Sequence, residues 1–283
     1  QSRAGVVLLN VACPPMDNNR EAGRETAREA GREAFRKWVL IIVMHLVALL
    51  AWQAWITLGK VEPYIMPAPL DTFATLLEYD TYRWGHNTMI TAASVFGGFW
   101  LAVIVGVTLA VLFSWSRILN DAFMPLIVSL NMIPKVALGP IFIVWFSYGL
   151  GPNILIAFSI CFLPILITTT RGLADVEPEL IDLVRTLRAS RWQIFTKIQL
   201  PGALPFIFSG MKVAVVLAVA GAIVGEFIAS EEGLGYLMMQ VQVTLDTAGM
   251  FMAVLMITAV GVALYGIVLL LERLLVVRDA RME

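Results

Sequence analysis

Charge is scarce in this sequence of 283 residues, because Asp, Glu, Lys and Arg together make up only 14% of it. An ordinary soluble domain carries roughly 25% charged residues, so the composition argues against a soluble globular protein. Basic and acidic residues number 20 and 21, and the formal net charge of -1 gives the whole chain no electrostatic basis for binding nucleic acid. We therefore expect no nucleic-acid partner.

Cysteine and histidine are also scarce, at two residues each. Cys13 lies in a polar segment and Cys161 in an apolar run, and their spacing fits neither a disulfide framework nor a zinc site. No Ser/His or metal-ligand pair stands at a useful spacing. The pair Gly59-Lys60 lacks the upstream Gly and the hydroxyl residue of a phosphate-binding loop. The sequence therefore predicts no catalytic residue, no metal site and no cofactor site of its own.

Apolar residues dominate instead, at 59% of the chain with a mean hydropathy of +0.81. Several runs without charge are long enough, at 1.5 Å per helical residue, to cross a hydrocarbon core of about 30 Å. These runs predict an all-α integral membrane protein with six transmembrane helices. The predicted spans are residues 38–58, 88–113, 122–146, 154–170, 206–229 and 249–276.

The placement of Lys and Arg predicts the orientation, because positive charge is retained on the cytoplasmic side of a membrane. With both termini in the cytoplasm, only Lys60 and Arg83 fall in outer connections, while Lys135 and Lys212 lie inside spans. The predicted organisation is a cytoplasmic tail at 1–37, a six-helix transmembrane domain at 38–276 and a short cytoplasmic tail at 277–283. The sequence leaves open whether the true start lies in the Gln1 region or at Met16.

The first tail and one long connection have helical patterns of their own. Residues 20–37 repeat Arg and Glu every four positions, which predicts a charged helix at the cytoplasmic face. Residues 171–205 connect the predicted fourth and fifth spans, and 178–198 is amphipathic, with basic residues beside apolar ones. From periodicity alone we favour a helix resting on lipid headgroups. Pro201 and Pro205 are expected to end that helix and restart the next span.

The order of residues in this connection resembles the loop signature of permease subunits of binding-protein-dependent ABC importers. That signature is Glu-Ala-Ala, three residues, Gly, nine residues and Ile-x-Leu-Pro. The spacing here is the same, although several identities differ. The matching positions are Asp182, Leu183 and Val184 for Glu-Ala-Ala, Arg188 for the Gly, and Ile198, Leu200 and Pro201 for Ile-x-Leu-Pro.

Further segments resemble nitrate/sulfonate/taurine-type permeases over roughly residues 60 to 275. They read IMPAPLDTFATLLE, IPKVALGPIFIVWFSYGLGP, VGEFIASEEGLGY and LLLERLL. The resemblance implies a type I ABC importer permease in the bacterial inner membrane. It implies as partners a second permease copy, two cytoplasmic ATPase subunits that bind ATP and Mg, and an extracytoplasmic solute-binding protein. The cargo it implies is nitrate, a sulfonate or taurine, or a pyrimidine-type or riboflavin-type precursor.

The same resemblance implies that a short helix of the 171–205 connection docks in a groove of the ATPase. Its apolar side would be buried there, and its basic side, including Arg185, would fix the register. Asp182, near the start of this helix, would complement the helix dipole.

Ionised residues inside the predicted spans are candidates for the translocation pathway. A Lys at a helix centre costs roughly 2.5–3.5 kcal/mol on insertion scales, so Lys135 should face protein or water. With Asn131 one turn before it and Pro134 beside it, the third span is predicted to open toward a central pathway. A Lys that reaches the interface or pairs with a carboxylate is an equally weighted alternative. Glu226 is the candidate partner or a gate residue.

Lys212 and one predicted outer loop receive simpler interpretations. Lys212 is interpreted as an anchor at the interface. Residues 231–236 should form an outer loop, for which docking of a binding protein and a plain turn are both considered.

A competing hypothesis is a secondary transporter driven by an ion gradient, with Lys135 and Glu226 as coupling charges. Such a carrier has no need for a long basic amphipathic connection between two spans, and the sequence shows no inverted repeat. We therefore favour the permease of an ATP-driven importer.

Overall fold

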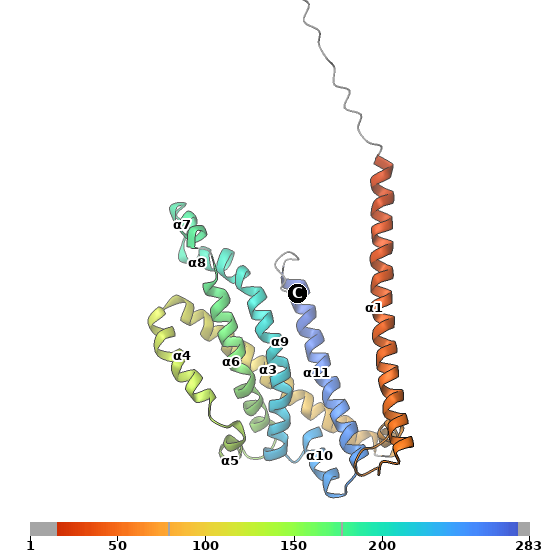
Figure 1. The fold of residues 1–283 in the computed structure, drawn as a ribbon. Helices are drawn as coiled ribbons and strands as arrows, with labels where there is room; N and C mark the ends of the chain where they lie inside the picture. The colour runs from red at the N-terminus through yellow and green to blue at the C-terminus, as the bar shows by residue number, and fades with distance from the viewer. Residues whose placement is uncertain (1–15, 79, 177, 277–283) are drawn as a thin grey trace, which may run out of the picture. The chain divides into compact units, whose positions relative to one another are not determined.

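The computed structural model describes residues 16–78, 80–176 and 178–276, and these residues form helices and turns without a strand (Figure 1). The chain divides into two units, residues 1–61 and 62–283. Each unit is considered by itself. The expected all-α class is confirmed for the described part of the chain.

The first unit contains one long helix, α1 (Met16–Gly59). Its second half, Val39–Gly59, is long and apolar enough to cross a membrane, which confirms the first predicted span. The Arg- and Glu-rich residues form the first half of the same helix. The expected boundary at residue 37 is therefore no break in the backbone, because α1 continues through it.

The second unit contains the remaining helices (Figure 1). In chain order they are α2 (Pro69–Glu78), α3 (Thr81–Trp115), α4 (Arg117–Asn131), α5 (Lys135–Phe146), α6 (Leu150–Ala174), α7 (Pro178–Thr186), α8 (Arg191–Ile194), a π-helical turn (Phe195–Gln199), α9 (Leu200–Ala229), α10 (Leu234–Val243) and α11 (Thr247–Leu275). Four segments of this unit reach membrane-spanning length, namely Arg83–Trp115, Leu150–Ala174, Arg191–Ala229 and Thr247–Leu275.

The third predicted span is bent rather than straight. Ile118–Asn131 and Lys135–Phe146 meet at an angle of 92° and together count as one further span. Pro134 lies at the bend, as the residue before α5. Proline has no N–H to donate and its ring crowds the preceding turn, which agrees with the break between Asn131 and Lys135. Among the described residues there are thus five spanning helices, or six with the bent pair, as the composition predicted.

Close contacts between small residues set the order of the helices in the second unit. Gly98 of α3 and Gly221 of α9 both closely approach Ala157 of α6, so α6 packs tightly against both helices. A Cβ added at Gly98 would lie 2.5 Å from the Ala157 Cβ, which no neighbour could tolerate without a shift. Small residues allow helices to approach this closely inside a membrane. The resulting core buries large side chains such as Phe99 and Ile165.

An ion pair joins α9 to α11. Lys212 Nζ lies 2.8 Å from Glu272 Oε2 and donates to Glu272 Oε1 at 2.9 Å. The Glu272 side chain is only 8% exposed, and that of Lys212 is 24% exposed. The interpretation of Lys212 as an interfacial anchor stays a prediction, and sequence reasoning did not bring Glu272 close to it.

Candidate functional site

The connection between α6 and α9 contains a helix that ends in a left-handed turn. Beyond the last residue of α7, the Ala189 N–H donates to the Val184 carbonyl at 3.1 Å, and the Arg188 N–H donates to the Arg185 carbonyl at 2.9 Å. These two bonds are those of a Schellman motif. Arg188 has a φ of 59°, which favours glycine. This geometry gives a physical reason for the Gly of the loop signature at the position that Arg188 occupies here.

The next turn is closed by a capping box at the start of α8. Ser190 Oγ accepts from the Gln193 N–H at 3.2 Å, and Gln193 Oε1 accepts from the Ser190 N–H at 2.8 Å. This reciprocal pair satisfies two donors that a helix start would otherwise leave unpaired. The amphipathic stretch is therefore two helices joined by a fixed turn, instead of the single helix that its periodicity suggested.

From α8 onward the helix continues into α9 without a stop. Leu200 N–H donates to the Phe195 carbonyl across the π-helical turn, directly before Pro201. In a regular α-helix the Pro201 ring would clash with the carbonyl four residues earlier, and the wider π turn changes the spacing at that point. The expectation that Pro201 and Pro205 end the helix is wrong, since both lie within α9.

The residues of the loop signature occupy different faces of this connection. Asp182 forms an exposed ion pair with Arg185, in which the Arg185 Nη1 donates to Asp182 Oδ1 at 3.2 Å. Leu183 is exposed. Val184, Arg188 and Ile198 line a cavity of about 360 Å³. Leu200 packs against the core, and Pro201 is exposed. Their predicted role in coupling stays a prediction.

The structure brings the candidate pathway residues of the third span together at its bend. Asn131 is the last residue of α4, Pro134 precedes α5 and Lys135 begins it. The half-buried Lys135 ammonium donates to the Asn131 backbone carbonyl at 3.1 Å. Glu226 is not its partner, because the Glu226 carboxylate bonds to other groups and the two side chains form no ion pair.

Glu226 instead holds the start of α10. Its side chain is fully buried, and Oε2 accepts from the Gly235 N–H at 2.7 Å and from Thr91 Oγ1 at 3.0 Å. Thr91 Oγ1 in turn accepts from the Leu234 N–H at 2.8 Å, and Asn87 Oδ1 accepts from the Gly233 N–H at 2.7 Å. Three consecutive N–H groups at the N-terminus of α10 are thus bound by side chains of α3 and α9.

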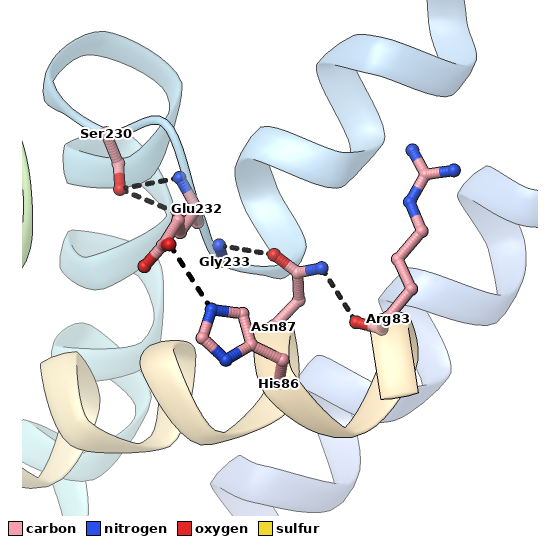
Figure 2. A network of polar contacts seen from close by, with 6 residues as sticks. All are labelled: Arg83, His86, Asn87, Ser230, Glu232 and Gly233. Atoms are coloured by element: carbon pink, nitrogen blue, oxygen red, sulfur yellow. Dashed lines mark hydrogen bonds and ion pairs between the residues drawn. The ribbon is translucent and has the colours of Figure 1, made fainter. Parts of the chain in front are cut away.

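The segment before α10 is tied to α3 by further polar contacts (Figure 2). Ser230 Oγ donates to the Glu232 carbonyl at 2.6 Å and accepts from the Glu232 N–H at 3.3 Å. Glu232 Oε1 lies 3.3 Å from His86 Nε2. Asn87 Nδ2 donates to the Arg83 carbonyl at 2.7 Å while its Oδ1 holds Gly233. This segment is therefore more than a plain turn, because Glu232 and Gly233 are both bound to side chains of α3.

Sequence reasoning missed Asn87, Thr91 and the Lys212–Glu272 pair. The signals were weak: Asn87 and Thr91 stand four residues apart on one helix face, and the glycines at 233 and 235 marked a turn. No local pattern connects them with Glu226. Within the described residues, no cluster of three or more His, Cys, Asp or Glu side chains is arranged to hold a metal ion.

Comparison with known proteins completes this picture. Residues 80–277 match the family described as "binding-protein-dependent transport system inner membrane component". A probable ABC transporter permease protein of Haemophilus influenzae is 34% identical over 77% of this chain and 89% of its own length. The riboflavin transport system permease protein of Chloroflexus aurantiacus is 36% identical over 83% of this chain and 88% of its own.

Two further similarities concern a more distant relative and a solved structure. The formylaminopyrimidine transport permease protein of Halalkalibacterium halodurans is 29% identical over 76% of this chain and 86% of its own length. An inward-facing structure of the MetNI methionine ABC transporter matches with a TM-score of 0.53 at 21% identity. That match covers 64% of this chain and 93% of the other, and it supports the fold alone.

Proposed function

This chain belongs to the family of binding-protein-dependent transport system inner membrane components and is a permease subunit of an ABC importer, and we propose how it is assembled and driven. Its multi-pass membrane character follows from the apolar helices. We place it in the bacterial cytoplasmic membrane with both termini inside, as the distribution of Lys and Arg favours. Two copies would form the pathway. Two separate ATPase subunits would bind ATP and Mg, and an extracytoplasmic solute-binding protein would deliver the cargo.

The α7 helix is the element that we propose to dock on the ATPase. Leu180, Leu183 and Leu187 share one side of it and are 40%, 59% and 75% exposed. Helices that bind in a groove of a partner protein bury an exposed apolar side of this kind there. Because the Schellman motif and the capping box fix the turn after α7, movement of the docked helix would be passed to α9 as a rigid lever. This exposed leucine side is the observation that carries the proposal.

The bend between α4 and α5 is our proposed part of the translocation pathway. Asn131, Pro134 and Lys135 meet there, and an ammonium group within a membrane segment favours a polar or anionic solute. The relatives named for riboflavin and formylaminopyrimidine support a precursor of that type, beside nitrate, sulfonates and taurine. Glu226 would belong to the frame of the pathway, since it is buried behind α10 instead of facing a solute.

The experiment compares two substitutions in α7 within the reconstituted transporter. Leu183→Asp places a charge on the leucine side, whereas Leu183→Met keeps an apolar side chain of similar size at the same exposed position. We expect Leu183→Asp to abolish both ATPase binding and ATP-driven uptake, and Leu183→Met to retain most of each. Equal retention by both variants would contradict docking through this side. Uptake without any ATPase subunit would favour an ion-gradient-driven carrier instead.

A further inference from the structure

A large cavity lies behind α7, on the side away from its exposed leucines. It has a volume of about 850 Å³ and lies among the end of α3, α7 and α8. Ile181 and Arg185 of α7 line it, and they stand on the opposite side of the helix from Leu183, since successive residues turn by about 100°. A groove of the ATPase that covers the leucines would therefore leave this cavity open to another ligand.

Two guanidinium groups line the cavity, and both have capacity to bind an anion. Arg191 has no side-chain partner within the part of the chain that the structure describes, and its side chain is exposed. Arg185 uses Nη1 for its exposed pair with Asp182, which leaves its other donors for a ligand. Ser114 and Gln199 add a hydroxyl and an amide to the lining. Planar guanidinium forks of this kind suit the oxygens of a phosphate group.

Aromatic rings give the same cavity an apolar side. Trp115 and Trp192 both line it, with ring centroids 6.4 Å apart, and Phe195 lies 5.7 Å from each of them. The two indoles are 58% and 63% exposed. Exposed indoles beside cations fit a ligand that is apolar at one end and anionic at the other.

The position of the cavity along the chain agrees with such a ligand. Trp115 is the last residue of the membrane-spanning segment Arg83–Trp115, so the cavity begins where the apolar span ends. Tryptophan is enriched at this level of a membrane because its ring sits among the headgroups. Anionic headgroups attract Lys and Arg at this depth.

We propose that this cavity binds the headgroup of an anionic phospholipid. Arg185 and Arg191 bind the phosphate oxygens, and Trp115 and Trp192 lie against the glycerol and the first carbons of the acyl chains. The bound lipid links α7 to the end of α3. The inference does not rest on the proposed docking of α7 on the ATPase, because it concerns the other side of that helix.

The test measures lipid binding directly, in the purified and delipidated transporter with its ATPase subunits. Native mass spectrometry compares phosphatidylglycerol with phosphatidylcholine of the same acyl chains. We expect the wild type to prefer phosphatidylglycerol, and the double variant Arg185→Gln/Arg191→Gln to lose about thirtyfold in affinity for it. The control variant Arg171→Gln removes an exposed cation at the end of α6 that does not line the cavity, and it should keep the preference.

Two further measurements complete the test. One distinguishes a lipid phosphate from inorganic phosphate, and the other tests the contribution of positive charge. Inorganic phosphate, added at constant ionic strength, should not displace the lipid if the indoles contribute to binding. Displacement by inorganic phosphate would mean a site for a soluble anion and would overturn the proposal. Arg185→Lys/Arg191→Lys retains both charges and should retain more of the preference than the Gln variant. Equal loss in the two double variants, or equal binding of both lipids by the wild type, would also overturn it.

Discussion

Two short helices that follow membrane-spanning segments, α7 and α10, are held in different ways. The turn after α7 is closed by bonds among its own neighbours, from Val184 to Gln193, and its side chains are mostly exposed. The start of α10 is held by buried side chains of α3 and α9, up to 146 residues away in the chain. A locally capped helix keeps its shape when it moves as a unit, whereas a helix bound to two spans moves only with them. This difference suits α7 as a lever that moves as a unit, and α10 as part of a fixed frame.

Among the substitutions that test this difference between α7 and α10, substitution of Glu226 should have the largest effect. Glu226→Ala leaves the Gly235 N–H and the Thr91 hydroxyl group without their acceptor in a buried site. Because an unsatisfied buried polar group costs about 1–3 kcal/mol, we expect a loss of about 2–4 kcal/mol in the free energy of unfolding. Thermal unfolding of the purified permease measures it. Glu226→Gln keeps an acceptor oxygen and should lose less than half as much, and equal losses would contradict the capping role.

Gly233→Ala should have the second largest effect. Gly233 has a φ of 108°, and an added Cβ would collide with the Glu226 carboxyl group. A left-handed conformation costs a residue with a Cβ about 1–2 kcal/mol, and the collision adds to this cost. We expect faster hydrogen exchange at the N–H groups of residues 233–235. Gly266→Ala, at a glycine with open space around it, is the matched control. Unchanged exchange in Gly233→Ala would argue against a tight fit at this end.

Removal of the capping box should act only on the loop after α7. Ser190→Ala deletes the hydroxyl that accepts from the Gln193 N–H, and such caps contribute about 1 kcal/mol. Because the contact is local, we expect faster hydrogen exchange across residues 188–194 with little change at α10. Ser190→Thr, which keeps the hydroxyl, should exchange like the wild type. An equal change at α10 would show that the two regions are not independent.

The smallest expected effect has the opposite sign. Arg188→Gly places glycine at the left-handed position that ends α7, where the loop signature carries Gly. The relief of backbone strain, less the entropy cost of glycine, should raise the free energy of local opening by about 0.5–1 kcal/mol. This increase would be measured as slower hydrogen exchange around residue 188. Arg188→Ala removes the same charge while keeping the Cβ, so it should bring no gain. A gain in both variants would attribute the effect to the charge of Arg188 instead of its backbone.

Much of the fold could be predicted because its causes are local. The apolar runs identified the spans, since transfer into a hydrocarbon core depends on composition and length. Pro134 marked the irregular third span, although its 92° bend was not predicted. The continuation of α8 into α9 was missed, because proline statistics do not include the π turn that accommodates Pro201.

The candidate sites show the same division. The amphipathic pattern of residues 178–198 predicted helix in the loop, while the break at Arg188 depended on backbone geometry that the pattern does not contain. The pairing of Lys135 with Glu226 was considered because they are two charges within spans. The structure gives the Lys135 ammonium a backbone carbonyl of α4 and gives Glu226 the start of α10.

By itself, the sequence determined the class of this protein and the approximate positions of its spans. These properties follow from hydropathy. Only the tertiary structure decided which side chains meet: Glu226 with Thr91, 135 residues earlier, and Lys212 with Glu272, 60 residues later. It also decided that the end of α3 lies beside α8 to form the large cavity. The physical reason is that close packing of small residues and the pairing of buried polar groups decide which helices lie side by side inside a membrane. Neither of these depends on the distance between two residues along the chain.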